Sequence, residues 1–304
     1  MARLDSPGYD LLALMHGSEG MLGIVVEVTV RLLPMPDSIA VVMASFDTVP
    51  AAGEAVSRII SNGILPAGLE MMDRLAIEAA EAYVGAGYPV GAEALLICEL
   101  DGTERDLEDQ LVLLRETLQA SGADNIRVAH DAEERARLWQ GRKAAFPAVG
   151  RIAPDYYCMD GTIPRRELAT VLTAISELSG KYNLPVANVF HAGDGNLHPL
   201  ILYDANKPGE LRQAEAFGAE ILELCIARGG TITGEHGVGV EKIDQMCIQF
   251  NPDELSVFHG VKASFDETGI LNPGKAVPTL SRCAEFGAMH IHAGEEKFPD
   301  LERF

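Results

Sequence analysis

The sequence predicts an α+β or α/β fold in which strands and helices alternate. Apolar runs of strand length recur at residues 39–46, 69–72 and 94–100, and the segments between them carry apolar side chains at helical spacing. Hydrophobic residues make up 47% of the chain and charged residues 23%, values typical of globular proteins. The 304 residues suffice for about two domains of roughly 150 residues each.

Helical periodicity and turn signals define the remaining elements. We expect helices over residues 49–62, 75–86, 103–121 and 165–180, and a further strand over residues 155–160. Nearer the C-terminus, Asn251, Pro252 and Glu254 supply the N-cap, the first-turn proline and the capping-box acid of another helix. This order of elements is typical of layered folds.

The two ends of the chain differ from the rest. A glycine-rich turn at residues 17–23 leads into alternating apolar residues at 24–32, a strand pattern that ends at Pro34. Because a lone strand with an apolar face cannot bury itself, we expect it to be the last strand of a unit whose earlier part is absent. Residues 280–304 show no clear periodicity and are expected to be a docking tail.

Charge and cysteine content exclude several classes of protein. Lysine and arginine total 24, and aspartate and glutamate total 45, which gives a net charge of −21. This charge repels phosphate backbones, so we expect no nucleic-acid partner. No apolar run approaches the roughly 20 residues of a transmembrane helix, and we expect a cytoplasmic protein. The five cysteines form no CxxC pair, so we expect buried thiols in a reducing compartment and no disulfide framework.

The strongest chemical signal lies in residues 186–203, where Asp194-Gly195 separates two apolar runs. This dipeptide is typical of a two-residue hairpin turn, in which both central residues have positive φ. With that turn, His191 faces His198 across the hairpin, and their Cβ atoms lie about 5 Å apart. Two imidazoles on one face suit a divalent metal. The alternative is a histidine pair packed in a half-buried sheet.

A second acidic and histidine-containing motif offers a third ligand. Glu235 and His236 lie between Gly234 and Gly237, after a short expected strand at residues 231–233. Two histidines and one carboxylate leave coordination positions open for a substrate, as in catalytic sites. The alternative is that Glu235 and His236 lie in a solvated turn.

Two further features have open interpretations. Arg142 is a candidate clamp for a carboxylate, since guanidinium offers a planar fork of donors; the alternative is an ordinary solvated arginine. The glycine-rich residues 17–23 precede a strand and are followed by no Walker lysine, so they do not form a typical phosphate loop. They indicate either a close backbone approach to a cofactor or a turn only.

Five motifs occur in the order found in one flavoenzyme family. They are G-S-E-G-x-L-G-I at 17–24, R-K-A-A-F-P at 142–147, H-A-G-D-G-N-L-H at 191–198, G-E-H-G at 234–237 and L-N-P-G-K at 271–275. On these motifs the chain resembles the FAD-linked oxidases of the vanillyl-alcohol-oxidase type. Within that family it is similar to the FAD-binding D subunits of bacterial glycolate oxidases, with D-lactate and D-2-hydroxyglutarate dehydrogenases as more distant members.

The resemblance implies an α+β fold: a ferredoxin-like antiparallel sheet with helices, the C-terminal domain of FAD-linked oxidases, plus a remnant of the FAD-binding domain. Residues 1–36 would be the end of the FAD-binding domain, most of which is expected to be missing. Residues 37–279 would form the substrate and cap domain, and residues 280–304 the C-terminal tail.

The resemblance also implies roles for individual residues. His191, His198 and Glu235 would bind a divalent metal, which could be zinc, manganese or iron. His236 would be the general base that removes the substrate's hydroxyl proton. Arg142 would anchor the substrate carboxylate.

The cofactor implied by the resemblance is FAD. Gly17, Ser18, Gly20 and Gly23 would contact it through the backbone, and Asn272 belongs to the family's C-terminal flavin-proximal motif. Relatives often have threonine where this chain has Met21.

The implied reaction is FAD-dependent oxidation of a small 2-hydroxy acid, glycolate to glyoxylate, by hydride transfer to the flavin. Cys158 and Leu200 stand where the hydroxyglutarate enzymes have lysine and asparagine, which favours a small monocarboxylate such as glycolate or D-lactate. Electrons would pass to a companion iron–sulfur subunit, and another flavin-domain subunit would complete a glycolate oxidase complex. Such partners could bring a cytoplasmic chain to the membrane.

Two other classes of function stay open at this stage. A metal-dependent hydrolase could use His191, His198 and Glu235 to activate water without a flavin. A catalytically incomplete fragment could act only as an interaction module for partner subunits. An upstream FAD domain favours the oxidoreductase, and hydrolysis by the metal-loaded chain favours the hydrolase.

Overall fold

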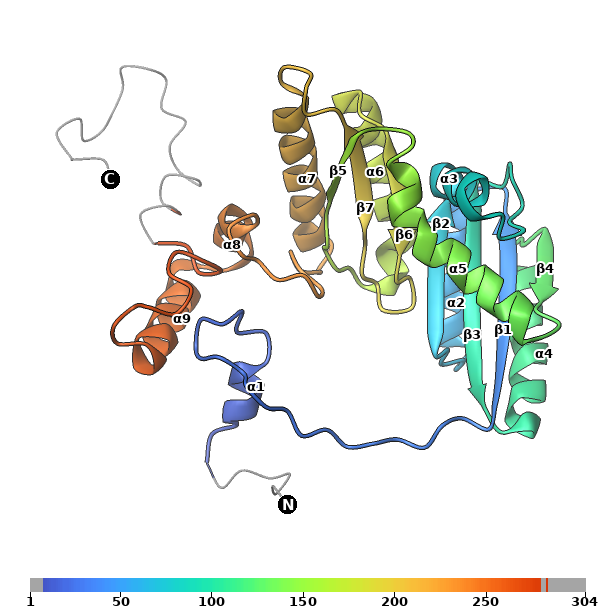
Figure 1. Cartoon of the computed structure of the whole chain (residues 1–304), viewed down its shortest axis with the longest axis horizontal. Coiled ribbons are helices and arrows are strands. Elements are labelled where there is room, and N and C mark those ends of the chain that lie inside the picture. The colour runs from blue at the N-terminus through green and yellow to red at the C-terminus, as the bar shows by residue number, and fades with distance from the viewer. Residues whose placement is uncertain (1–7, 280–282, 284–304) are drawn as a thin grey trace. The chain divides into compact units, whose positions relative to one another are not determined.

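The computed structural model describes residues 8–279 and Cys283. The chain divides into two compact units, residues 30–236 and a smaller unit that combines residues 1–29 with residues 237–304. Each unit is described separately (Figure 1). Apart from Cys283, the expected tail over residues 280–304 lies outside the described residues. Among the described helices, none combines the length and the apolar character needed to cross a membrane.

The larger unit is built on a seven-stranded sheet with the order β4-β1-β3-β2-β6-β7-β5. All its paired strands are antiparallel, which confirms the α+β prediction over the α/β alternative. The strands are β1 (Ser38–Phe46), β2 (Gly68–Asp73), β3 (Ala94–Gly102), β4 (Asn125–Val128), β5 (Asp155–Cys158), β6 (Val186–Phe190) and β7 (Pro199–Tyr203).

Helices cover both faces of this sheet. One layer contains α2 (Val49–Ser61), α4 (Glu104–Ala120), α6 (Leu168–Tyr182), which the short 3₁₀ helix η1 (Arg165–Glu167) precedes, and α7 (Glu210–Ala227). The opposite layer contains α3 (Arg74–Val84) and α5 (Ala132–Val149), which crosses the front of the sheet in Figure 1. Polar side chains fix the helix starts: Thr48, Asp73, Thr103 and Asp131 each accept a backbone N–H of the first turn.

The core between the sheet and α5 decides which side chains reach the candidate site. It contains alternate residues of the strands, such as Met43, Met72 and Ile97, packed against Leu138 and Ala145 of α5. Because strand side chains alternate between faces, every second residue of β2, β6 and β7 points to this same layer. The face continues beyond the ends of β6 and β7, where the two histidines lie.

The hairpin between β6 and β7 differs from the prediction. Asn188 pairs with Pro199, and His191 pairs with Asn196, so the predicted pairing of His191 with His198 is wrong. Residues 192–195 form the turn, and within it only Gly195 has a positive φ, +73°. A register shift of two residues leaves both histidines on the predicted face, because side chains alternate with a period of two.

A long-range contact accounts for the longer turn. The backbone N–H of Ile163 donates to the Gly195 carbonyl at 2.9 Å. A Cβ atom on Gly195 would lie 2.2 Å from the Ile163 carbonyl oxygen, so only glycine fits at this position. The turn is therefore shaped by packing against a distant segment and not by the Asp-Gly pair alone.

The smaller unit contains α1 (Leu11–Met15), α8 (Ile243–Gln249) and α9 (Pro252–Phe265). The start of α9 has the predicted capping box, in which Asn251 and Glu254 each accept a backbone N–H of the other. Cys247 and Cys283, 36 residues apart, form a disulfide, so the expectation that the cysteines are unpaired is wrong for this pair. Nothing in a spacing of this length indicates pairing.

The strand predicted over residues 24–32 is absent. The segment is extended, pairs with no described strand, and exposes its apolar side chains, including 91% of Val26 and 85% of Leu32. A strand requires a neighbour for its backbone hydrogen bonds, and the described residues offer none here.

Candidate metal and substrate site

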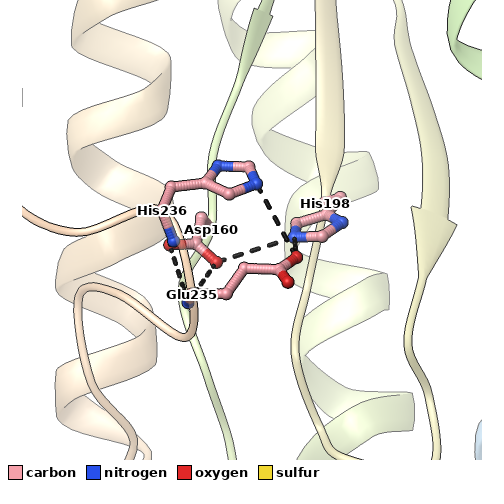
Figure 2. A group of neighbouring side chains, drawn as sticks. All are labelled: Asp160, His198, Glu235 and His236. Carbon is pink, nitrogen blue, oxygen red and sulfur yellow. Dashed lines mark hydrogen bonds and ion pairs between the residues drawn. The ribbon is translucent and has the colours of Figure 1, made fainter. Parts of the chain in front are cut away.

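Four side chains of the larger unit converge beside the end of β7: Asp160, His198, Glu235 and His236 (Figure 2). One possible ligand atom from each lies within 4.8 Å of all the others. Nε2 of His198 lies 3.0 Å from Oε1 of Glu235, and Nε2 of His236 lies 3.7 Å from the same oxygen. His198 and Asp160 are buried, whereas Glu235 and His236 are exposed at the surface.

His191 completes the group that the sequence predicts. Its Nε2 lies 3.7 Å from Oε1 of Glu235, and its ring centre lies 5.1 Å from that of His198, with the two rings nearly perpendicular. One carboxylate oxygen of Glu235 therefore faces the Nε2 atoms of three imidazoles. The structure brings together all four residues predicted for the metal and the base.

Neighbouring rings hold the side chain of His198. Phe146 of α5 meets the imidazole edge-on at 6.2 Å between ring centres, and His236 stacks on it at 4.9 Å. Nδ1 of His198 is buried and has no hydrogen-bond partner among the described residues. Packing against the two rings and the contacts of Nε2 with Glu235 and Asn196, at 3.0 and 3.4 Å, therefore position the ring.

The loop that carries Glu235 and His236 is organised by Asp160, which the sequence analysis did not single out. The Asp160 carboxylate accepts the Thr233 hydroxyl at 2.6 Å and the backbone N–H groups of Gly234, Glu235 and His236 at 2.9 to 3.2 Å. Figure 2 shows this carboxylate beside the loop, with dashed lines to the backbone of Glu235 and His236. The strand expected over residues 231–233 is reduced to a single bridge between Thr231 and Thr162. Asp160 is the last residue of the strand expected over residues 155–160, and no local pattern distinguishes it from its neighbours.

Gly234 allows this loop to approach the hairpin. A Cβ atom at Gly234 would lie 2.5 Å from Oδ1 of Asn196, closer than side chains can pack. Asn196 is the hairpin residue that pairs with His191. The glycine in the G-E-H-G motif therefore lets the loop reach the two histidines.

The predicted clamp residue Arg142 is buried on α5, and its guanidinium faces a protein carboxylate. Its Nε and Nη2 lie 2.9 and 2.8 Å from Oε2 of Glu70 on β2. The other oxygen of Glu70 lies 2.8 Å from Nδ1 of His191. This hydrogen bond raises the pKa of His191, against a smaller opposing effect of burial. Sequence analysis missed Glu70 because no local pattern distinguishes it from other strand residues.

In the smaller unit, the two segments predicted to contact FAD lie against each other. The side-chain amide of Asn272 donates to the Glu19 carbonyl, and the Glu19 carboxylate accepts the backbone N–H groups of Val238 and Gly239 at 2.7 and 2.8 Å. Lys262 donates to the carbonyl oxygen of Met21 at 2.8 Å. The glycine-rich residues 17–23 are thus held in a defined conformation.

The donor set fits a divalent transition metal. Imidazole suits zinc, iron and other transition metals, carboxylate suits manganese, and zinc accepts both. The Nε2 atoms and the Glu235 oxygen point to one place from two separate segments, which is what a shared ligand requires. Partial exposure of Glu235 and His236 leaves one side open to a small molecule.

Solved structures with a similar fold include a methylhydroxylase and a synthase. The chain matches p-cresol methylhydroxylase with substrate bound at a TM-score of 0.62 and 15% identity, covering 82% of this chain and 54% of that one. Alkyldihydroxyacetonephosphate synthase matches at a TM-score of 0.62 and 15% identity, covering 90% and 52%. At these identities the likeness establishes the fold alone.

The family is established by sequence. Residues 35–276 match the family described as FAD linked oxidases, C-terminal domain, and the chain belongs to this family. This confirms the resemblance drawn from the five motifs.

Several curated relatives are oxidoreductases of 2-hydroxy acids by name. The glycolate oxidase subunit GlcD of Escherichia coli (strain K12) is 64% identical over 301 residues, covering 99% of this chain and 60% of the relative. GlcD of Bacillus subtilis is 38% identical, covering 89% and 58%, and a probable mitochondrial D-lactate dehydrogenase of Danio rerio is 32% identical, covering 90% and 55%. The chain thus spans about 60% of the length of these relatives.

Proposed function

We propose that the chain is the substrate-binding and cap part of an FAD-dependent 2-hydroxy acid oxidoreductase that oxidises glycolate to glyoxylate, with D-lactate as the alternative substrate. The observation that carries this proposal is the convergence of His191, His198 and His236 on one carboxylate oxygen of Glu235. Such a site in the cap domain of an FAD-linked oxidase suits a small, polar, metal-chelating substrate. Similarity to GlcD supports glycolate.

His191, His198 and Glu235 would hold the divalent metal. When bound, the metal supplies Lewis acidity that lowers the pKa of the substrate hydroxyl and fixes its orientation. The two histidines come from the ends of neighbouring strands, so their separation is set by the sheet. Glu235 comes from the loop and closes the site from the other side (Figure 2).

His236 would accept the hydroxyl proton at Nε2. Its ring is held parallel to that of His198, with an angle of 15° between the planes, while the side chain is 46% exposed and therefore accessible to substrate. A positioned imidazole within reach of the substrate hydroxyl is an efficient general base. The two electrons leave the substrate α-carbon with its hydrogen as a hydride, and the product is the 2-oxo acid.

FAD would supply the acceptor for this hydride. Gly17, Ser18, Gly20, Gly23 and Asn272 would contact it, since glycine backbone without Cβ atoms allows a close approach. These residues share the smaller unit, where Asn272 is bonded to the same loop. Their assignment rests on the family motif.

Two apolar positions support a small substrate. Cys158 on β5 and Leu200 on β7 are cross-strand partners, and Leu200 is fully buried. Neither offers a charge for a second carboxylate. Arg142 remains the proposed anchor of the single substrate carboxylate, through the part of its guanidinium that Glu70 does not occupy.

The proposed partners are a companion flavin-domain subunit and an iron–sulfur subunit, which together would form a glycolate oxidase complex in the cytoplasm or, through those partners, at the membrane. The name of GlcD as a subunit supports a complex. Among the described cysteines, one pair forms a disulfide and the others are separated along the chain, an arrangement unsuited to holding a cluster.

The test combines binding with turnover. The full chain, loaded with Mn²⁺ or Zn²⁺, is titrated with glycolate and D-lactate by calorimetry, and dye reduction is measured after adding FAD and the subunits that co-purify with it. We expect glycolate binding that requires metal and is lost in Glu235→Gln. Ester or amide hydrolysis by the metal-loaded chain without flavin would instead support the hydrolase alternative and overturn the proposal.

A further inference from the structure

We propose that Glu70 is a positioning residue that holds His191 with its proton on Nδ1 and its Nε2 turned toward the site. The inference rests on the proposed metal site, because it concerns the orientation of one proposed ligand. It assigns a role to a buried carboxylate that neither the motifs nor the proposed reaction uses.

The sheet places Glu70 beside His191. β2 and β6 are antiparallel, with Met71 opposite Phe190 and Met72 opposite Val189. Continuing this register by one residue sets Glu70 opposite His191, on the face that packs against α5. The Gly193 N–H donates to the Leu69 carbonyl at 2.9 Å and fixes the hairpin to β2 at the same level. The contact between Glu70 and His191 is thus imposed by the backbone.

The two oxygens of Glu70 have separate partners. Oε2 receives the guanidinium of Arg142, at 2.9 Å from Nε and 2.8 Å from Nη2, and Oε1 lies 2.8 Å from Nδ1 of His191. The side chains of Glu70 and Arg142 are 10% and 8% exposed. A carboxylate that faces an arginine guanidinium acts as a hydrogen-bond acceptor. Nδ1 of His191 must therefore carry the proton in this hydrogen bond.

A proton on Nδ1 leaves Nε2 as the nitrogen with a free lone pair for a metal. Nε2 is the atom that lies 3.7 Å from Glu235. His198 differs, because its Nδ1 has no such partner among the described residues and its ring is held by Phe146 and His236. Carboxylates that accept from a metal-bound histidine fix its tautomer and raise its basicity.

Three variants distinguish a role of Glu70 in orienting His191 from a role in pairing with Arg142. Glu70→Gln keeps an oxygen acceptor for Nδ1–H but removes the charge facing Arg142. Glu70→Met removes both. The double variant Glu70→Met/Arg142→Met leaves no unpaired buried arginine, so it folds even if the single Met variant does not. Glu99→Gln is the matched control, because Glu99 is bonded to Trp139 at 2.7 Å and lies outside the site.

The first readout is the affinity of the full chain for Zn²⁺ and Mn²⁺, measured by competition with a chelating dye. We expect Glu70→Met and the double variant to bind roughly 10- to 100-fold more weakly than wild type. Glu70→Gln and Glu99→Gln stay near the wild-type affinity. If Glu70→Gln and Glu70→Met weaken metal binding equally, and the double variant recovers the wild-type affinity, Glu70 acts through its ion pair with Arg142 alone. That result would overturn the inference.

The second readout needs no metal. Nitrogen-15 NMR of histidine-labelled chain, at a pH where His191 is neutral, reports which ring nitrogen carries the proton. We expect the Nδ1–H form in wild type and a mixture of tautomers in the double variant. If the NMR result is as expected but wild type binds no metal, the role of Glu70 is supported and the metal site is refuted. An unchanged tautomer in the double variant would refute the inference itself.

Discussion

The candidate site has two arms that are held in place by different means. We call His191 and His198 the strand arm, because they follow β6 and precede β7, and Glu235 and His236 the loop arm. Backbone pairing along β2, β6 and β7 fixes the strand arm. The loop arm has a single bridge nearby and depends on the carboxylate of Asp160. The strand arm is therefore fixed by many backbone contacts, and the loop arm by fewer contacts that centre on Asp160.

Replacing the base should give the largest effect. His236→Asn removes the proton acceptor of the loop arm and leaves the three proposed metal ligands, so kcat should fall about 10²- to 10⁴-fold. Metal affinity should stay near wild type. The matched variant in the strand arm, His198→Asn, should no longer bind the metal. Steady-state dye reduction and dye-competition metal binding measure both, and a His236→Asn chain that loses its metal would contradict the assignment of roles.

Removing the Asp160 carboxylate, which organises the loop arm, should give the next largest effect. Asp160→Ala deprives the Thr233 hydroxyl and the backbone N–H groups of Glu235 and His236 of their buried acceptor, whereas the Gly234 N–H keeps the Asp160 carbonyl oxygen at 2.8 Å. At roughly 1 kcal/mol for each hydrogen bond, the free energy of unfolding should fall by about 3 kcal/mol. Asp155→Ala is the control, since its carboxylate accepts from Ala205 at an exposed position. Equal urea-unfolding curves for the two variants would show that Asp160 does not organise the loop.

A methyl group added at Gly234 should strain the contact between the loop arm and the hairpin that carries the strand arm. Gly234→Ala places a Cβ atom 2.5 Å from Asn196, so it should cost about 1 to 3 kcal/mol and displace Glu235 from the histidines. Gly180→Ala in α6 is the control, because its Cβ would meet nothing within 4 Å and alanine favours helix. The melting temperature and the metal affinity of the two variants are compared with those of wild type. A Gly234→Ala chain as stable as Gly180→Ala would mean that the loop is not packed on the hairpin.

The smallest expected effect is a pH dependence of the free energy of unfolding, which arises at Asp73 beside the strand arm. Asp73 at the end of β2 accepts the backbone and side-chain N–H groups of Asn188 on β6 at 2.9 and 2.8 Å, and burial raises its pKa to about 6. The folded-state pKa exceeds the unfolded value, so this contribution to stability is full below pH 4 and is lost as the pH rises through 6.

The matched comparison uses Asp73→Asn, which cannot ionise there. The urea midpoint of wild type should fall relative to that of Asp73→Asn between pH 4 and pH 7, while exposed Asp101→Asn leaves the wild-type profile unchanged. If the urea midpoints of wild type and Asp73→Asn change with pH in the same way, Asp73 is not the source of the pH dependence.

Local patterns suffice for most of the fold and for half of the site. Strand-length apolar runs predict β1, β2 and β3, and the capping box predicts α9. The faces of His191 and His198 follow from side-chain alternation, which survives the register error. The motifs supply Glu235 and His236.

The remainder depends on long-range contacts. Glu70 meets His191 across 121 residues, and Asp160 meets the loop across 74 to 76 residues. The turn at Gly195 is set by Ile163, and Cys247 pairs with Cys283. Such contacts form only when each unit folds, so no local periodicity encodes them. Positioning residues are therefore harder to predict than ligands.

The central claim is that His191, His198 and Glu235 bind one divalent metal. Anomalous diffraction from crystals of the full chain grown with Mn²⁺ or Zn²⁺, recorded at the absorption edge of the metal, tests it most directly. The account predicts one peak at about 2.0 to 2.2 Å from Nε2 of both histidines and from the Glu235 carboxylate. A peak bound elsewhere, or none at saturating metal, would contradict it.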